Sequence, residues 1–235
     1  MKKTILVSGG SGNLATELTR QFQKGSLVAL PKEELNICDP SNIKDVLDSL
    51  SPEYFIHTAA LTRPMKAHTE DPGLSIRTNI VGTANVALEC IKRDIKLIYI
   101  STDYVYPGIS GNYNEESPLL PVNDYAWSKL GGECSVNLCP NSLILRMALC
   151  ESPFPHPRAV CDIKKSYISI ENGAALILKL KDQKGIINIG GPPSTPYDFA
   201  KQSRPKVEKL TLAEVNDTKL AKDSTLNIDK LKALL

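Results

Sequence analysis

TILVSGGSGNLATELTRQF, residues 4–22, joins an apolar run, a glycine-rich turn and a helix-forming segment. The apolar residues 4–8 are typical of a parallel strand buried on both faces. We expect the turn to lead directly into a helix over residues 16–22. Strand, glycine turn and helix in this order are the context that a dinucleotide-binding fingerprint requires.

The spacing of small residues in the turn supports this interpretation. Gly9 allows a tight turn, Gly12 allows the backbone to approach a pyrophosphate, and Ala15 allows close helix packing. The free N–H groups and positive dipole end of the helix favour an anion. The spacing is looser than G-x-G-x-x-G, and a bare glycine turn is the alternative. The expected cofactor contacts here are Gly9, Ser11, Gly12, Asn13 and Leu14.

Further apolar runs continue the pattern along the chain. Residues 27–30, 54–57, 96–100 and 143–146 are expected strands, and 74–93, 124–136 and 170–180 are expected helices. Strands that alternate with helices predict an α/β fold with a Rossmann-type, doubly wound parallel sheet. We expect residues 1–146 to form the NAD(P)-binding domain. Residues 147–235 are expected to form a small C-terminal substrate lobe, intertwined with a late strand and helices of the same domain.

The end of the second strand bears on the cofactor type. An NAD site usually places an acid here, whereas this chain continues with Pro31 and Lys32. The missing acid and the lysine favour NADPH, with NADH as the alternative. Ile37 and Asp39 are expected beside the adenine, and Asp39 is also placed to cap a helix that begins near Ser41. Ala59 and Ala60 leave room for a flat ligand.

Composition excludes several classes of protein. The 235 residues carry a formal net charge of +2, which argues against nucleic acid or an anionic membrane as the main partner. No apolar run approaches the length that spans a membrane. The six cysteines show no C-x-x-C pair, so we expect reduced thiols in a cytoplasmic protein and no metal site.

Tyr125 and Lys129 are four residues apart, which is one turn of a helix. A neighbouring cation favours phenolate and lowers the pKa of a tyrosine, so this pair suits general acid/base work. Thr102 follows the strand at 96–100, at the carboxyl edge where ligands bind in such sheets. Its hydroxyl is therefore expected to reach the same carbonyl as Tyr125. Trp127 is expected in the core.

These motifs come in the order found in extended short-chain dehydrogenase/reductases. Within that superfamily, the run STDYVYPG at 101–108 resembles the dTDP-4-dehydrorhamnose reductases. The run GIINIGG at 185–191 and the close DSTLN at 223–227 resemble the same family. The likeness implies Thr102, Tyr125 and Lys129 as catalytic residues. It implies Ser101, Tyr125 and Lys129 as cofactor contacts, and Thr102, Asp103, Tyr104 and Arg63 as substrate contacts.

The implied reaction is NADPH-dependent reduction of the 4-keto group of a nucleotide-linked 4-keto-6-deoxy sugar. Two alternatives stay open: a sugar-nucleotide epimerase or dehydratase, and a non-catalytic dinucleotide-binding regulatory subunit like that of methionine adenosyltransferase. The likeness also implies a homodimer. Residues 147–169 are shorter than the family's substrate lobe, and Arg158, Lys164 and Lys165 are either diphosphate contacts or solvated loop charges.

Overall fold

A parallel sheet of six strands forms the centre of the computed structural model, which describes residues 4–23, 25–215 and 220–235. The strand order is β2-β1-β3-β4-β5-β9. The bounds are β1 Thr4–Ser8, β2 Ser26–Leu30, β3 Tyr54–His57, β4 Lys96–Thr102, β5 Ser142–Met147 and β9 Gly185–Ile189. The chain order reverses beside β1, so the carboxyl ends of β1 and β3 open the crevice in which doubly wound folds bind ligands. The expected fold class is confirmed.

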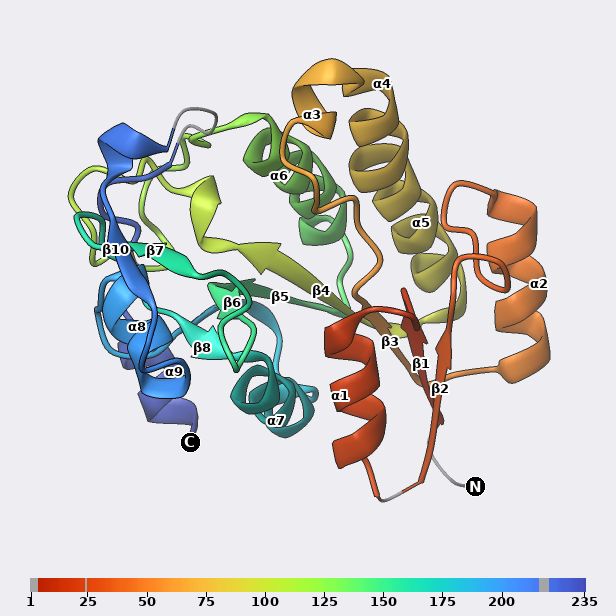
Figure 1. Cartoon of the computed structure of the whole chain (residues 1–235). Helices are drawn as coiled ribbons and strands as arrows, with labels where there is room; N and C mark the ends of the chain where they lie inside the picture. The colour runs from red at the N-terminus through yellow and green to blue at the C-terminus, as the bar shows by residue number, and fades with distance from the viewer. Residues whose placement is uncertain (1–3, 24, 216–219) are drawn as a thin grey trace.

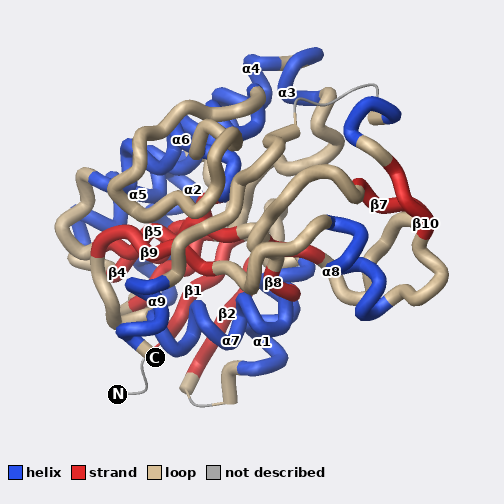
Figure 2. The backbone as a smooth tube through the Cα atoms, turned by 90° about the vertical axis from the view of Figure 1, so that its left-hand side faces the viewer, coloured by secondary structure: helices blue, strands red, loops and turns tan. Residues whose placement is uncertain are grey.

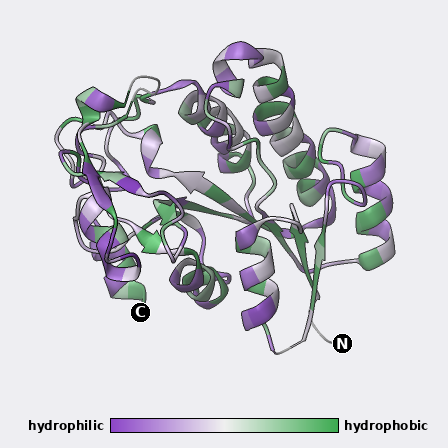
Figure 3. Cartoon of the chain, viewed as in Figure 1, coloured by the Kyte–Doolittle hydropathy of each residue, from purple (hydrophilic) through white to green (hydrophobic). Residues whose placement is uncertain are grey.

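Helices cover both faces of the sheet (Figure 1). On one face lie α1 Asn13–Gln21 and α7 Ile170–Leu180, and on the other lie α2 Pro40–Leu50, α5 Thr83–Arg93 and α6 Asp124–Asn137. Each face has its own apolar core. Leu18 and Ile177 belong to the first core, and Ile43, Val86 and Val136 to the second. Figure 3 shows the same layering, with hydrophobic strands inside and mixed helices outside.

The helical segment that ends in α5 is one continuous run of three parts. It consists of α4 Pro72–Ser75, the wider π-type turn η1 Ile76–Gly82, and α5, and the short helix α3 Ala67–Glu70 precedes it. Asp71 caps α4 through the Leu74 N–H at 2.8 Å. The predicted helix at 74–93 is thus confirmed, and its π-type part contains the buried Asn79.

Short elements after β5 form a small lobe at one side of the sheet (Figure 2). They are β6 Leu149–Cys150, β7 Arg158–Val160, β8 Ile168–Ser169, α8 Pro196–Ser203, β10 Glu208–Leu210 and η3 Leu212–Glu214. The last helix, α9 Asp229–Leu234, packs against β9, and its Leu231 belongs to the first core. Two small parallel pairs, β7 with β10 and β6 with β8, hold this region together. No helix in the described ranges is both long and apolar enough to cross a membrane.

Candidate active site

The glycine turn after β1 is built for close backbone approach. Gly9 has φ +72°, and a Cβ there would lie 2.9 Å from the backbone of Ala59. A Cβ on Gly10 would lie 2.7 Å from the carbonyl carbon of Leu30. The Gly12 N–H donates to the Gly9 carbonyl at 2.9 Å, which closes the turn at the start of α1. The turn therefore fits tightly between β2 and the end of β3 because positions 9 and 10 carry no side chains.

The first turn of α1 has the features of an anion site. Gly12 is the N-cap and provides no side-chain cap, and the first turn contains no acidic residue. Ser11, Gly12 and Asn13 are exposed, and Leu14 is half-buried. The first N–H groups of a helix lack partners within it, so this end can accept a pyrophosphate. The residues expected to contact the cofactor here are thus brought together.

The residues expected at the adenine end of the cofactor lie in the segment after β2, and they differ in exposure. Lys32 is exposed on the turn that follows β2, while Ile37 is buried. Asp39 caps α2 by accepting from the N–H groups of Ser41 at 2.9 Å and Asn42 at 3.3 Å. The capping prediction is confirmed, and capping uses one carboxylate oxygen, Oδ1.

Polar contacts of the His57 ring hold the end of β3 in place. His57 is buried, and its ring nitrogens lie 2.8 Å from Ser8 Oγ and 3.0 Å from Thr83 Oγ1. Burial lowers the pKa of His57 to about 3, so this residue is neutral and packed. Ala59 and Ala60 follow as half-buried small residues beside the glycine turn.

Asn79 anchors the loop after β3 to α6. Its carboxamide accepts from the Leu61 N–H at 2.8 Å and donates to the Leu61 carbonyl at 2.9 Å. The same Nδ2 lies 2.8 Å from Ser128 Oγ. A Cβ on Gly132 would lie 2.5 Å from the Asn79 carbonyl oxygen, so α6 approaches η1 this closely because position 132 is glycine.

Thr102 and Tyr125 meet at the carboxyl end of β4, as the sequence predicts. Tyr125 lies in the first turn of α6, whose N-cap Asn123 accepts from the Ala126 N–H at 2.9 Å. Its ring lies 5.3 Å from that of His68. Burial and the charge of Asp103 raise the pKa of Tyr125 to about 12. The prediction of a lowered pKa is therefore wrong for the chain by itself.

Lys129 is buried one turn after Tyr125, with its ammonium 4.1 Å from the centre of the Tyr99 ring. Burial lowers the pKa of Lys129 to about 7, and Glu133 one turn further on opposes this effect. Tyr99 is fully buried and donates its hydroxyl proton to the Lys129 carbonyl at 3.0 Å. The lysine is thus held rigidly in a weakly polar site.

Lys165 is a buried cation beside the carboxyl end of β4. Its ammonium lies 2.9 Å from Asp103 Oδ2, and the two side chains are only 4% and 2% exposed. It also lies 3.5 Å from the centre of the Tyr104 ring. The positive charge of Lys165 opposes the rise in the pKa of Tyr125. Lys165 is therefore neither a diphosphate contact on the surface nor a solvated loop charge.

A second buried ion pair joins α6 to β5. Arg146 Nη2 lies 2.5 Å from Glu133 Oε1, and both side chains are almost fully buried. Ser101 donates to Glu133 Oε2 at 2.6 Å, and Arg146 donates to the Tyr106 hydroxyl at 2.8 Å. The Ser101 hydroxyl, expected at the cofactor, is thus engaged in this network.

The remaining expected residues lie further out. Arg63 is exposed and pairs with Glu151 at 3.2 Å, which links the loop after β3 to the loop after β6. Arg158 pairs with Glu214 at 2.6 Å on the surface. Trp127 is 52% exposed, so its expected place in the core is wrong.

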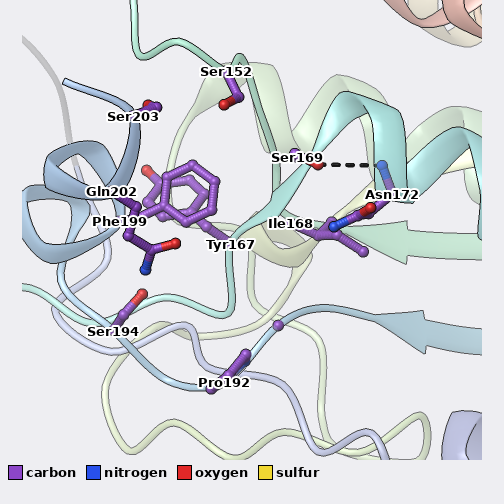
Figure 4. Close-up of a pocket in the computed structure, with 11 residues that line it drawn as sticks. Ser152, Tyr167, Ile168, Ser169, Asn172, Pro192, Ser194, Phe199, Gln202 and Ser203 are labelled. Atoms are coloured by element: carbon purple, nitrogen blue, oxygen red, sulfur yellow. Dashed lines mark hydrogen bonds between the residues drawn. The ribbon is translucent and has the colours of Figure 1, made fainter.

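A cavity of about 500 Å³ lies between the start of α7 and α8 (Figure 4). Two aromatic residues, Tyr167 and Phe199, line it with their ring centres 5.3 Å apart. Serines and amides make up most of the remaining lining, and none of the lining residues is charged: Ser152, Ile168, Ser169, Asn172, Gly191, Pro192, Ser194, Gln202 and Ser203. The Tyr167 ring also lies 5.3 Å from the Lys165 ammonium, so the cavity adjoins the Asp103–Lys165 pair.

Sequence reasoning missed Glu133 and assigned Lys165 the wrong surroundings. Glu133 follows Lys129 by four residues, so the helical spacing that links Tyr125 to Lys129 could have found it. The pairing of Lys165 with Asp103 gives no such signal, because α6 and β5 lie between the two residues along the chain.

Residues 1–150 match the family model described as the RmlD substrate binding domain. The methionine adenosyltransferase 2 subunit beta of Pongo abelii is 31% identical over 143 residues, covering 57% of this chain and 42% of that protein. The match thus spans less than half of the relative's length.

Solved structures match over nearly the whole chain. A dTDP-4-dehydrorhamnose reductase from Bacillus anthracis in complex with NADP is 23% identical, with a TM-score of 0.89 and coverage of 99% of this chain and 93% of that one. A hypothetical dTDP-4-dehydrorhamnose reductase from Sulfolobus tokodaii is 26% identical, with a TM-score of 0.88 and coverage of 99% and 94%.

Proposed function

The chain belongs to the RmlD substrate binding domain family, and from this premise and the site geometry we propose that it is an NADPH-dependent reductase. Its substrate would be a nucleotide-linked 4-keto-6-deoxy sugar, reduced at the 4-keto group. The observation that carries the proposal is the pair of Tyr125 and the buried Lys129, one helical turn apart on α6, with Thr102 at the end of β4. Residues 1–146 would bind the cofactor and hold Thr102 and Tyr125, and residues 147–235 would form the small substrate lobe.

The cofactor proposal rests on the fit of the turn. Side chains at Gly9 and Gly10 would clash with the neighbouring backbone, and α1 offers unpaired N–H groups without a competing acid. Gly9, Ser11, Gly12, Asn13 and Leu14 would hold the pyrophosphate. The neighbour from Bacillus anthracis is a complex with NADP, which favours the same cofactor here. Lys32 would meet a 2′-phosphate, and Ile37, Asp39, Ala59 and Ala60 would surround the adenine side.

Bound NADPH would supply a hydride to the substrate carbonyl. Tyr125 would donate its proton to the alkoxide that forms, and a raised pKa keeps it protonated at neutral pH for this task. Thr102 would hydrogen-bond the same oxygen as charge develops. Lys129 would bind the nicotinamide ribose, which provides the polar partner that its buried ammonium needs.

The substrate would extend from Tyr125 toward the cavity between α7 and α8. Asp103, Tyr104 and Arg63 would contact the sugar side. The aromatic residues Tyr167 and Phe199 suit an uncharged ring, such as a base, better than a diphosphate, because no cation lines that cavity.

A second function is favoured by one observation. The relatives found by sequence include the methionine adenosyltransferase 2 subunit beta, so a regulatory subunit without turnover is the alternative. An epimerase or dehydratase on the same scaffold is the other. An epimerase recycles its cofactor, so a net loss of NADPH would distinguish a reductase from it.

A homodimer is proposed on the face formed by α4, η1, α5 and α6. Large apolar side chains are exposed there: Leu74, Ile76, Val81, Leu88, Ile91 and Trp127. Such patches mark interaction surfaces, and two-fold dimers are the commonest assemblies. Sedimentation of the purified chain would test this: a single species of monomer mass at high concentration would contradict it.

The experiment that tests the function is a screen of nucleotide-linked keto sugars with NADPH and NADH, followed by absorbance of the reduced nicotinamide. We expect stoichiometric loss of NADPH with one substrate class. Tyr125→Phe should slow that loss by about 10²–10⁴-fold while NADPH binding persists. Unchanged turnover in this variant would remove Tyr125 from its role, and binding without turnover on any sugar would favour the regulatory subunit.

A further inference from the structure

His68 is a buried histidine whose ring packs against the ring of Tyr125. It lies in the short helix α3 and is only 2% exposed. The centres of the two rings are 5.3 Å apart and their planes are inclined by 63°, which is the edge-to-face arrangement that aromatic pairs favour. The short helices α3 and α4 both contact α6 (Figure 1). Thr69 fixes α3 there by donating to Asp124 Oδ2 at 2.7 Å, one residue before Tyr125.

The two ring nitrogens of His68 have different surroundings. Nδ1 lies 2.7 Å from the Oγ atom of Ser75, which is buried on α4. Nε2 is the one buried side-chain nitrogen or oxygen in the described chain that has no hydrogen-bond partner. Buried polar atoms in folded proteins nearly always have a partner, so this atom requires an explanation. Burial lowers the pKa of His68 and the charge of Asp124 opposes this effect, so the ring is neutral at pH 7 and carries one proton.

Ser75 decides which nitrogen of His68 carries that proton. Within the described residues, the hydrogen bond of the Ser75 hydroxyl is the one to Nδ1. If Nδ1 carried the proton and donated it to Ser75, the serine proton and the lone pair of Nε2 would both lack partners. If Nε2 carries the proton, the serine donates to Nδ1 and only the Nε2–H group is left over. Two buried groups without partners cost more than one, so the tautomer with the proton on Nε2 is favoured.

We propose that His68 is a positioning residue for Tyr125, whose ring it holds by donating the Nε2 proton to the ring face. The face of an aromatic ring carries negative charge and accepts an N–H group weakly. This contact gives the Nε2 proton a partner and ties the ring to Ser75 on α4. It also favours the phenolate, whose ring is richer in electrons, and thereby assists the release of the tyrosine proton. The inference rests on the proposed role of Tyr125 as the acid.

Nitrogen-15 NMR of the histidine rings tests the tautomer in the chain without cofactor or substrate. We expect His68 to carry its proton on Nε2. The signal of that proton should be shifted upfield, because the proton lies over the face of an aromatic ring. A proton on Nδ1 of His68 would overturn the proposal. The tautomer is measured in the unchanged chain, so this result does not depend on the folding of any variant.

Two replacements of Tyr125 separate the effect of its ring from that of its hydroxyl. Tyr125→Phe keeps the ring and should keep the upfield shift of the His68 proton, whereas Tyr125→Leu should lose it. His57 is the internal control: its nitrogens contact Ser8 and Thr83, so its signals should be the same in all three proteins. An equal shift of the His68 proton in the Tyr125→Phe and Tyr125→Leu proteins would overturn the proposal.

Turnover tests the positioning role of His68. His68→Phe keeps a ring against Tyr125 but has no N–H group to donate. It should lower kcat by about 2–5-fold, the effect of one weak hydrogen bond, while KM and the Kd for NADPH stay unchanged. His156→Phe changes an exposed histidine in the same way and should leave kcat unchanged. Equal kcat values in these two variants would overturn the positioning role.

The two kinds of measurement keep this inference apart from the proposed reaction. The NMR experiments need neither turnover nor cofactor, so they decide whether His68 donates to the ring even if no sugar nucleotide is reduced. Turnover without the expected tautomer would leave the reductase in place and remove His68 from its role. The expected tautomer without turnover on any substrate would contradict the proposed function instead.

Discussion

The glycine turn after β1 and the side-chain network around Tyr125 belong to one site but are encoded differently. The turn is built from neighbours in sequence, and its strand, glycines and helix lie within residues 4–21. The network joins residues that are far apart, such as Asp103 with Lys165 and Glu133 with Arg146. The first region constrains the backbone, whereas the second depends on the balance of buried charges.

The largest expected effect on stability comes from breaking the Glu133–Arg146 ion pair of the side-chain network. Arg146→Met leaves Glu133 buried without its partner, and it removes a hydrogen bond to Tyr106. We expect a loss of about 3–5 kcal/mol in the free energy of unfolding, which is the typical cost of breaking a buried ion pair. Chemical denaturation measures this. Arg158→Met, which breaks the exposed pair with Glu214, is the matched control and should cost less than about 1 kcal/mol. Similar losses of stability in both variants would contradict the distinction between the buried and the exposed ion pair.

The next largest effect comes from adding a side chain to the glycine turn after β1. Gly10→Ala places a Cβ 2.7 Å from the Leu30 carbonyl carbon, so the turn or β2 must move. We expect a loss of about 1–3 kcal/mol in stability from this overpacking. The variant should also bind NADPH about tenfold or more weakly, which isothermal titration calorimetry would measure.

Gly12→Ala provides the comparison for this variant. Its Cβ would meet only the Gly9 carbonyl oxygen, at 3.2 Å, so it should fold with a smaller loss than Gly10→Ala. It should still weaken NADPH binding, because position 12 faces the proposed pyrophosphate. If Gly12→Ala bound NADPH as tightly as the unchanged chain, the turn would not be the cofactor site.

The smallest effect has the opposite sign and concerns Lys129. Burial lowers the pKa of Lys129 from 10.5 to about 7 in the folded chain. Between these values the unfolded chain binds more protons, so the free energy of unfolding should rise as the pH increases from 7 to 10.5. Lys129→Met should stabilise the protein at pH 7, where burying the ammonium still carries a cost, and should lose this part of the slope.

Denaturation at several pH values measures this effect. A less stable Lys129→Met protein with an unchanged slope would mean that the buried ammonium carries no cost. A cost confirmed here would identify Lys129 as a residue that the fold retains for a reason other than stability.

The two regions also differ in how well the sequence predicts them. The strands, the α7 bounds and the meeting of Thr102 with Tyr125 follow from periodicity, turn chemistry and helical spacing. The prediction for the pKa of Tyr125 is wrong because it considered only the lysine one turn away. In the folded chain burial and Asp103 dominate, and the charge of Lys165 opposes them. Trp127 was misplaced because helical periodicity cannot tell an apolar face that meets the sheet from one that is exposed.

A crystal structure of the chain with NADPH would test most directly whether both regions serve one cofactor. We predict a pyrophosphate on the N–H groups of residues 11–14 and a nicotinamide ring beside the hydroxyl of Tyr125, with Lys129 on its ribose. A dinucleotide bound elsewhere, or one whose nicotinamide lies out of contact with Tyr125 and Lys129, would contradict the account.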